Sequence, residues 1–270
     1  MTKTAAPMTS GSIWKQMTFF AMPIFLGNLF QQLYNTVDSL IVGNFLGSSA
    51  LAAVSSSGSL IFMLIGFLSG ISAGAGVIVA RFFGAGDEKN LQRAVHTTVA
   101  FGLVAGVLMT GVGVALSPQI LRWMDTPESV MRESVTYLQI YFAGSLGFVM
   151  YNVLVGILQA VGDSRHPLYY LIVSSVINLV LDLLFITGFH TGVGGAAVAT
   201  VISQIVSALL CFWQLLRTKE SYGLKIRKIR FDKGILVQII KIGLPSGVQN
   251  SIIAFANVIV QSNINAFGEM

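Results

Sequence analysis

Seven long apolar runs constrain this chain more than any other feature of its sequence. Each is at least as long as the roughly 20 residues that a helix needs to cross the hydrocarbon core of a bilayer. They cover Met17–Val42, Leu51–Ala80, Ala94–Leu116, Val135–Leu158, Leu168–Gly188, Gly194–Leu216 and Ile235–Phe267. None shows the alternation of polar and apolar residues that is typical of membrane barrel strands. We therefore predict an all-α integral membrane protein with seven transmembrane helices.

The overall composition excludes a soluble fold. Hydrophobic residues make up 54% of the chain and charged residues only 10%, whereas charged residues make up about a quarter of a soluble domain. The mean hydropathy is +0.77. A soluble protein with this composition would expose large apolar patches. Cys211 is the only cysteine, which excludes a disulfide scaffold.

The positive charges lie in the loops and are divided unevenly between the two sides of the predicted topology. Of 16 Lys and Arg residues, all but Arg122 and Arg132 share the side of the N-terminus. Cytoplasmic loops carry such an excess. We therefore predict a multi-pass protein of the inner (cell) membrane with a cytoplasmic N-terminus, and we expect no nucleic acid partner. The Lys225–Lys233 stretch is interpreted as a linker that sets topology, with binding to anionic membrane lipid as the alternative.

The last apolar run repeats the first when the sequence is shifted by 222 residues. Four identities then align: Pro23 with Pro245, Asn28 with Asn250, Asn35 with Asn257 and Phe45 with Phe267. Six spans separate the two copies, so both enter the membrane from the same side, as in transporters built from parallel repeats. The expected organisation is a cytoplasmic segment (1–16), a six-helix lobe (17–216), a basic cytoplasmic linker (217–234) and the first helix of an incomplete second lobe (235–270). We expect a truncated twelve-helix transporter.

Two acidic residues, Asp38 and Asp182, lie inside predicted spans. A carboxylate near the bilayer centre costs roughly 2.5–3.5 kcal/mol on insertion scales, and such residues usually face a cavity and bind an ion, a proton or a cationic ligand. Tyr34 precedes Asp38 by four residues, and Asn178 precedes Asp182 by four. Each pair therefore shares one helix face.

Other polar residues of the spans repeat this pattern. Thr200 and Gln204 are four residues apart, and Asn152 and Gln159 are seven apart. Together with the acids, such side chains supply the oxygen ligands that small hard cations prefer. They equally suit a proton relay, and the spacing leaves both readings open. Interhelical hydrogen bonding is the alternative for Asn152, Gln159 and Gln204.

Several stretches resemble a known family. They are MPIFLGNLFQQLYNTVDSLIVGNFLG, ARFFGAGDEKN, GILQAVGDSRHPL, and INLVLDLLFITGF followed by GVGGAAVATVISQ. The sequence resembles the multidrug and toxic compound extrusion (MATE) transporters, in particular their prokaryotic DinF-like branch. The resemblance implies two six-helix lobes around a central cleft. It also implies multidrug efflux by antiport, in which organic cations or amphiphilic drugs leave as protons or sodium ions enter, without a cofactor and without enzymatic chemistry.

The resemblance also implies roles for particular residues. The cation- or proton-coupling residues are Tyr34, Asp38, Asn178, Asp182 and Thr200, of which all but Tyr34 are candidate sodium ligands. Asn152 matches a further polar residue of the cavity, and Gln204 is placed with it. Pro23 matches the proline at which the family's first helix bends. A second lobe, or self-association of the short chain, is the implied protein partner.

Three alternatives remain. A lipid-linked oligosaccharide flippase of the same superfamily would line its cleft with cations for pyrophosphate, but the cores of the spans carry no Lys or Arg. An intramembrane aspartyl protease also needs two carboxyl groups, yet the GxGD signature is absent around Asp38 and Asp182. The third alternative is an inactive transporter fragment.

Overall fold

Helices account for nearly all of the computed structural model, which describes residues 12–124 and 126–266. They are α1 (Ile13–Leu46), α2 (Ser48–Gly84), α3 (Glu88–Trp123), α4 (Glu128–Ala143), α5 (Ser145–Ala160), α6 (Arg165–Leu183), a π-helical turn η1 (Leu184–Gly188), α7 (Gly192–Arg217), a short 3₁₀ turn η2 (Ile226–Lys228) and α8 (Lys233–Ala266). The predicted all-α fold is confirmed. Residues 1–11 of the predicted N-terminal segment and residues 267–270, which include the repeat match at Phe267, lie outside the described residues.

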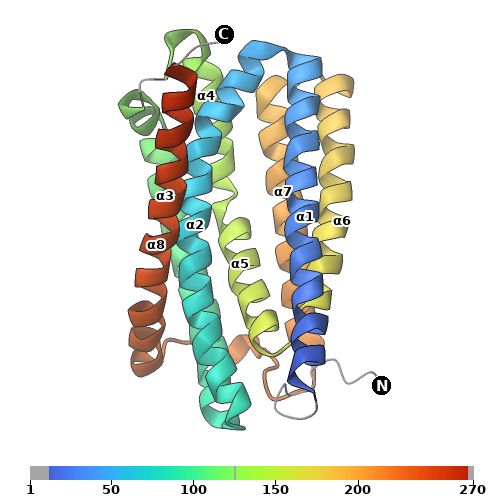
Figure 1. Ribbon diagram of the computed structural model, residues 1–270, viewed down its shortest axis with the longest axis vertical. Helices are drawn as coiled ribbons and strands as arrows, with labels where there is room; N and C mark the ends of the chain where they lie inside the picture. Colours follow the sequence, from blue (N-terminus) through green and yellow to red (C-terminus); the bar gives the residue numbers. More distant parts are fainter. Residues whose placement is uncertain (1–11, 125, 267–270) are drawn as a thin grey trace.

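The helices stand side by side, and the chain passes from one end of the bundle to the other (Figure 1). The described N-terminal end of α1 and the linker between α7 and α8 lie at the same end. Two apolar clusters hold the bundle together. One joins α2, α3, α5 and α7 to the linker and the start of α8. The other joins α1, α2, α4 and α7 at the opposite end.

The helices extend beyond the predicted spans, and their connections are correspondingly short. Gly47 alone separates α1 from α2, and its φ of 89° lies in the region that favours glycine. Asp87 caps α3 by accepting a hydrogen bond from the backbone N–H of Asn90 at 3.1 Å. This hydrogen bond lowers the pKa of the Asp87 carboxyl. The capped start of α3 therefore lies in the polar region at the end of the bundle.

The predicted fourth span consists of two helices. α4 and α5 meet at Gly144 with a bend of 50°. A Cβ atom at Gly144 would lie 2.3 Å from a methyl group of Val201 in α7, so glycine permits this close approach. Apolar periodicity could not reveal the bend, because the chain is apolar on both sides of it. The expectation of one continuous helix over Val135–Leu158 is therefore corrected.

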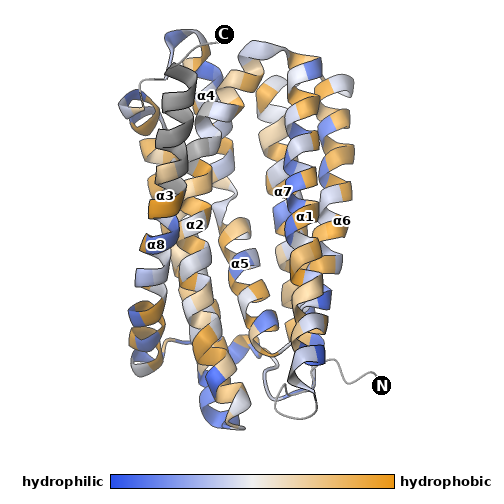
Figure 2. Ribbon diagram, viewed as in Figure 1, coloured by the Kyte–Doolittle hydropathy of each residue, from blue (hydrophilic) through white to orange (hydrophobic). Residues whose placement is uncertain are grey.

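The outer surface of the bundle is apolar, with large exposed side chains such as Phe19, Val107 and Leu209. Figure 2 shows hydrophobic colouring along most of the outside and hydrophilic residues at the ends. Among the described residues, four helices are each long and apolar enough to span a membrane, and the bent α4–α5 pair makes a fifth. α1 is not among them because polar side chains interrupt it. Several of those side chains line a polar pocket.

α8 packs against α2 through glycines. A Cβ atom on Gly70 of α2 would lie 2.3 Å from the backbone of Gly247 in α8, and one on Gly74 would lie 2.3 Å from Gly243. Small residues let membrane helices approach until their backbones touch. The helix that repeats α1 is therefore held against α2 and away from α1.

Candidate functional site

A small polar pocket of about 190 Å³ opens beside α1. Figure 2 shows hydrophilic residues about half-way along this helix, within an otherwise apolar bundle. α1, α4 and α7 supply the polar lining: Gln31, Tyr34, Asn35, Asp38, Ser39, Tyr137, Tyr141, Thr200 and Gln204. Apolar residues of α2 close part of the wall, among them Ile61 and Phe62. The pocket thus gathers polar groups from helices far apart in sequence.

Asp182 lies behind this pocket, near the end of α6, and its relative exposure is 0%. The Asn178 amide joins it to α7. In the orientation of this amide that gives both its nitrogen and its oxygen a partner, the nitrogen donates to Oδ2 of Asp182 at 2.8 Å. The oxygen accepts from the backbone N–H of Thr200 at 3.2 Å. The Thr200 hydroxyl donates to the carbonyl of Ala196 at 3.0 Å. Asp38 of α1 adjoins Asn178, Asp182 and Thr200. Four of the predicted residues, from three helices, therefore lie together.

The carboxyl groups of Asp38 and Asp182 are electrostatic neighbours. Oδ1 of each is buried and has no hydrogen-bond partner among the described residues. A carboxylate can only accept hydrogen bonds, so a hydrogen bond between two carboxyl groups requires a proton on one of them. No basic residue is among the electrostatic partners of either carboxyl group. The pair is therefore suited to hold a proton or a small cation.

A π-helical turn, η1, follows directly after the segment that carries Asp182. The backbone N–H of Phe189 donates to the carbonyl of Leu184 at 3.0 Å, which is the wider spacing of a π turn. Such turns are frequent at functional sites. Here the turn begins at Leu184, directly after the last residue of α6 and two residues after the buried Asp182.

Tyrosines surround the acidic pair, and two of them were not predicted. Tyr34 of α1 lines the same pocket as Asp38 and Thr200. Tyr137 and Tyr141 of α4 also line the pocket, and both are buried. Their four-residue spacing is the same signal that marked Tyr34 and Asp38, so it could have identified them. Their place near a span end made an interfacial aromatic role equally plausible from the sequence.

The remaining predicted residues are placed differently. Gln204 lines the same pocket as Asp38, and its buried Oε1 has no partner among the described residues. Asn152 and Gln159 line a separate pocket of about 340 Å³ between α2 and α5. Asn152 donates to the backbone carbonyl of Phe148 at 2.9 Å. Pro23 lies inside α1, which continues through it, and it is not part of the pocket.

The donor set favours a proton or a hard monovalent cation over a transition metal. The described residues contain no group of three or more His, Cys, Asp or Glu side chains able to hold a metal ion together. The available groups are two carboxylates, an amide and hydroxyl oxygens, which suit hard cations.

Comparison with known proteins supports the resemblance stated above. The MatE family profile matches residues 23–184. "Probable multidrug resistance protein YoeA" of Bacillus subtilis is 34% identical over 264 residues, which cover 95% of this chain and 57% of the relative. "Probable multidrug resistance protein YpnP" of the same organism is 32% identical over 265 residues, or 98% of this chain and 59% of the relative. The chain thus spans little more than half the length of these relatives.

Solved structures show the same helical arrangement. A MATE crystal structure in complex with MaL6 has a TM-score of 0.88 at 27% identity, over 97% of this chain and 58% of the other. A MATE in the straight conformation has a TM-score of 0.84 at 28% identity, over 93% of this chain and 56% of the other. Because the family profile covers more than half of the chain and both Bacillus relatives exceed 30% identity, the chain belongs to the MatE family of multi-pass membrane transporters.

Proposed function

We propose that this chain forms the first lobe of a multidrug exporter and carries its cation-coupling site. The lobe comprises residues 17–216. Residues 217–234 form a cytoplasmic linker, and residues from 235 onward begin the second lobe. The relatives named as multidrug resistance proteins support export of drugs. The observation that carries the coupling assignment is the pair of facing carboxyl groups, Asp38 and Asp182, each with a buried oxygen that lacks a partner.

The cost of burying like charges explains how this pair couples cation binding to a conformational change. Two adjacent carboxylates repel each other in a medium of low dielectric constant. A proton or sodium ion removes that repulsion and lets α1 bend at Pro23, whose missing N–H weakens the helix there. When the cation leaves, the repulsion returns and favours the other arrangement of α1 and α6. The drug and the cation thereby move in opposite directions.

The excess of Lys and Arg at the end of the bundle that carries the linker supports a cytoplasmic N-terminus in the inner membrane. In this orientation the cation reaches the carboxyl pair from outside and leaves to the cytoplasm. The substrates that fit a site of negative charge with tyrosine neighbours are organic cations.

The direct test is efflux of a cationic dye from cells that express the full-length transporter with Asp182→Asn. The substitution preserves shape but removes one negative charge, so we expect active efflux to fall at least tenfold. Asp87→Asn is the matched control. Asparagine also caps helices, and Asp87, which caps α3, does not line the pocket. Undiminished efflux by Asp182→Asn at equal expression would refute the coupling assignment.

The coupling ion is identified in vesicles that contain the same two variants and the parent protein. Dye movement is driven either by a proton gradient or by a sodium gradient, with the other ion balanced. The gradient that drives the parent protein, but not Asp182→Asn, identifies the ion. Equal movement without either gradient would contradict antiport.

A further inference from the structure

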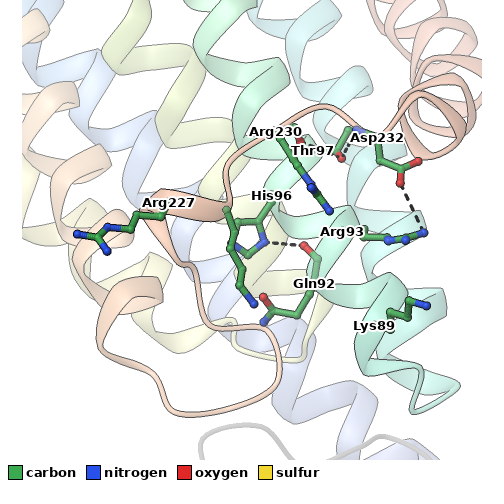
Figure 3. A pocket seen from close by; sticks show the side chains of 9 residues that line it. Lys89, Gln92, Arg93, His96, Thr97, Arg227, Arg230 and Asp232 are labelled. Carbon is green, nitrogen blue, oxygen red and sulfur yellow. Dashed lines mark hydrogen bonds and ion pairs between the residues drawn. The ribbon is translucent and has the colours of Figure 1, made fainter.

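A basic pocket of about 430 Å³ lies between the start of α3 and the linker (Figure 3). It shares no lining residue with the pocket beside α1. The first turns of α3 contribute Lys89 and Arg93 to its lining, and the linker contributes Arg227, Lys228 and Arg230. Asp232 is its one acidic lining residue among those that the structure describes. The coupling mechanism proposed above uses none of these residues.

The pocket has a defined shape because α3 holds the linker in place. Nε2 of the buried His96 accepts a hydrogen bond from the backbone N–H of Lys225 at 3.0 Å. The hydroxyl of Thr97, one residue further along α3, accepts from the backbone N–H of Asp232 at 3.1 Å. These bonds fix the linker backbone on both sides of its basic residues. The cations are therefore presented from a fixed scaffold and not from a free loop.

The single acidic lining residue is already neutralised. Asp232 pairs with Arg93 at 3.7 Å, and its Oδ1 accepts from the backbone N–H of Ile235 at the start of α8. Among the described residues, no acidic side chain forms an ion pair with the other four cations, which are Lys89, Arg227, Lys228 and Arg230. Figure 3 shows Arg230 extending from the linker toward α3 and Arg93. The pocket therefore carries uncompensated positive charge.

Apolar side chains beside the pocket place it at the edge of the bilayer. Ile226 and Phe231 of the linker are 60% and 47% exposed, although both are apolar. Further along α3, Val104 and Val107 are exposed as well. Val104 follows Thr97 by seven residues, which corresponds to about 10 Å along a helix. The pocket therefore lies near the headgroup layer, where cations and apolar side chains of one segment can contact lipid together.

We propose that this pocket binds the phosphate headgroup of an anionic membrane phospholipid. The guanidinium of Arg230 offers paired donors that match phosphate oxygens, and Lys89 and Lys228 add charge from opposite walls. Ile226 and Phe231 rest on the acyl chains of the same bilayer. A soluble phosphate compound would share the headgroup chemistry but would make no use of these apolar side chains. Bound lipid adds to the hydrogen bonds that already hold the linker against α3.

Native mass spectrometry of the purified protein in neutral detergent tests the proposal, with dioleoyl phosphatidylglycerol and dioleoyl phosphatidylcholine as probes. We expect preferential binding of phosphatidylglycerol. The triple variant Lys89→Gln, Lys228→Gln and Arg230→Gln should bind it about 100-fold more weakly, because each Lys or Arg near an anionic surface contributes about fivefold. The variant leaves the Arg93–Asp232 pair and the bonds of His96 and Thr97 intact.

A matched triple variant removes the same charge outside the pocket: Lys15→Gln, Arg165→Gln and Lys219→Gln, all exposed. It should keep the affinity of the parent protein. Equal loss in both triple variants would show nonspecific attraction and overturn the proposal. If sn-glycerol 1-phosphate displaced phosphatidylglycerol at the concentration at which the lipid itself binds, the pocket would belong to a soluble phosphate compound. That result would also overturn the proposal. Dye efflux is not measured, so the outcome is independent of the coupling site.

Discussion

At the scale of single residues, the candidate site keeps buried carboxyl oxygens without hydrogen-bond partners, which lowers the stability of the protein. Asp182 is fully buried, and its Oδ1 and that of Asp38 lack partners among the described residues. Burying a polar group without a hydrogen bond costs roughly 1–3 kcal/mol by mutational measurements. Functional sites frequently keep such unfavourable groups because activity requires them. The acidic pair should therefore limit the stability of the protein while it enables cation binding.

Asp38→Asn should therefore stabilise the protein. The new amide can donate a hydrogen bond to the carboxyl group of Asp182, and one negative charge is removed. A gain of about 1 kcal/mol should raise the midpoint of thermal unfolding in detergent by roughly 2–4 °C for a protein of this size. Thr36→Ala, two residues away on α1 but exposed and outside the pocket lining, serves as the control and should leave the midpoint unchanged. A lower midpoint for Asp38→Asn would contradict the cost assigned to the pair.

At the scale of helices, close contact between α2 and α8 positions the start of the second repeat. Gly70 and Gly74 of α2 meet Gly243 and Gly247 of α8 with no space for a Cβ atom. Such contacts replace the hydrophobic effect, which does not drive helix association within lipid.

Gly70→Ala should weaken this contact. Its Cβ would overlap the backbone of α8, and overpacking of this kind costs about 1–3 kcal/mol. Gly58→Ala is the control on the same helix, because no atom lies within 4 Å of a Cβ at Gly58. We expect the thermal midpoint to fall for Gly70→Ala and to stay or rise for Gly58→Ala. Cysteine crosslinking between α2 and α8 should slow only in Gly70→Ala, and equal behaviour of the two variants would refute the proposed contact.

At the scale of the whole molecule, the sequence predicted the helical membrane fold because spans depend on apolar length alone. It also singled out Asp38 and Asp182, since a carboxyl group in an apolar run is costly anywhere in the membrane. It did not predict the bend at Gly144 or the place of Asn152 in a separate pocket. Both depend on packing against other helices, which is not encoded in local periodicity. Tyr137 and Tyr141 were missed for another reason: their place near a span end also fits an aromatic role at the membrane interface.

The chain also spans little more than half the length of its curated relatives. The carboxyl pair itself lies entirely on α1 and α6. Cation binding can consequently be measured on this lobe even where drug transport requires the second one.

Cation binding by the purified protein is therefore the most direct test of the coupling site. Proton exchange in weakly buffered solution and equilibrium binding of radioactive sodium would be measured for the parent protein and for the double variant Asp38→Asn and Asp182→Asn. We expect about one exchangeable proton or one sodium ion per parent chain, since two facing carboxyl groups share a single cation, and none in the double variant. Equal cation binding by both proteins would contradict it.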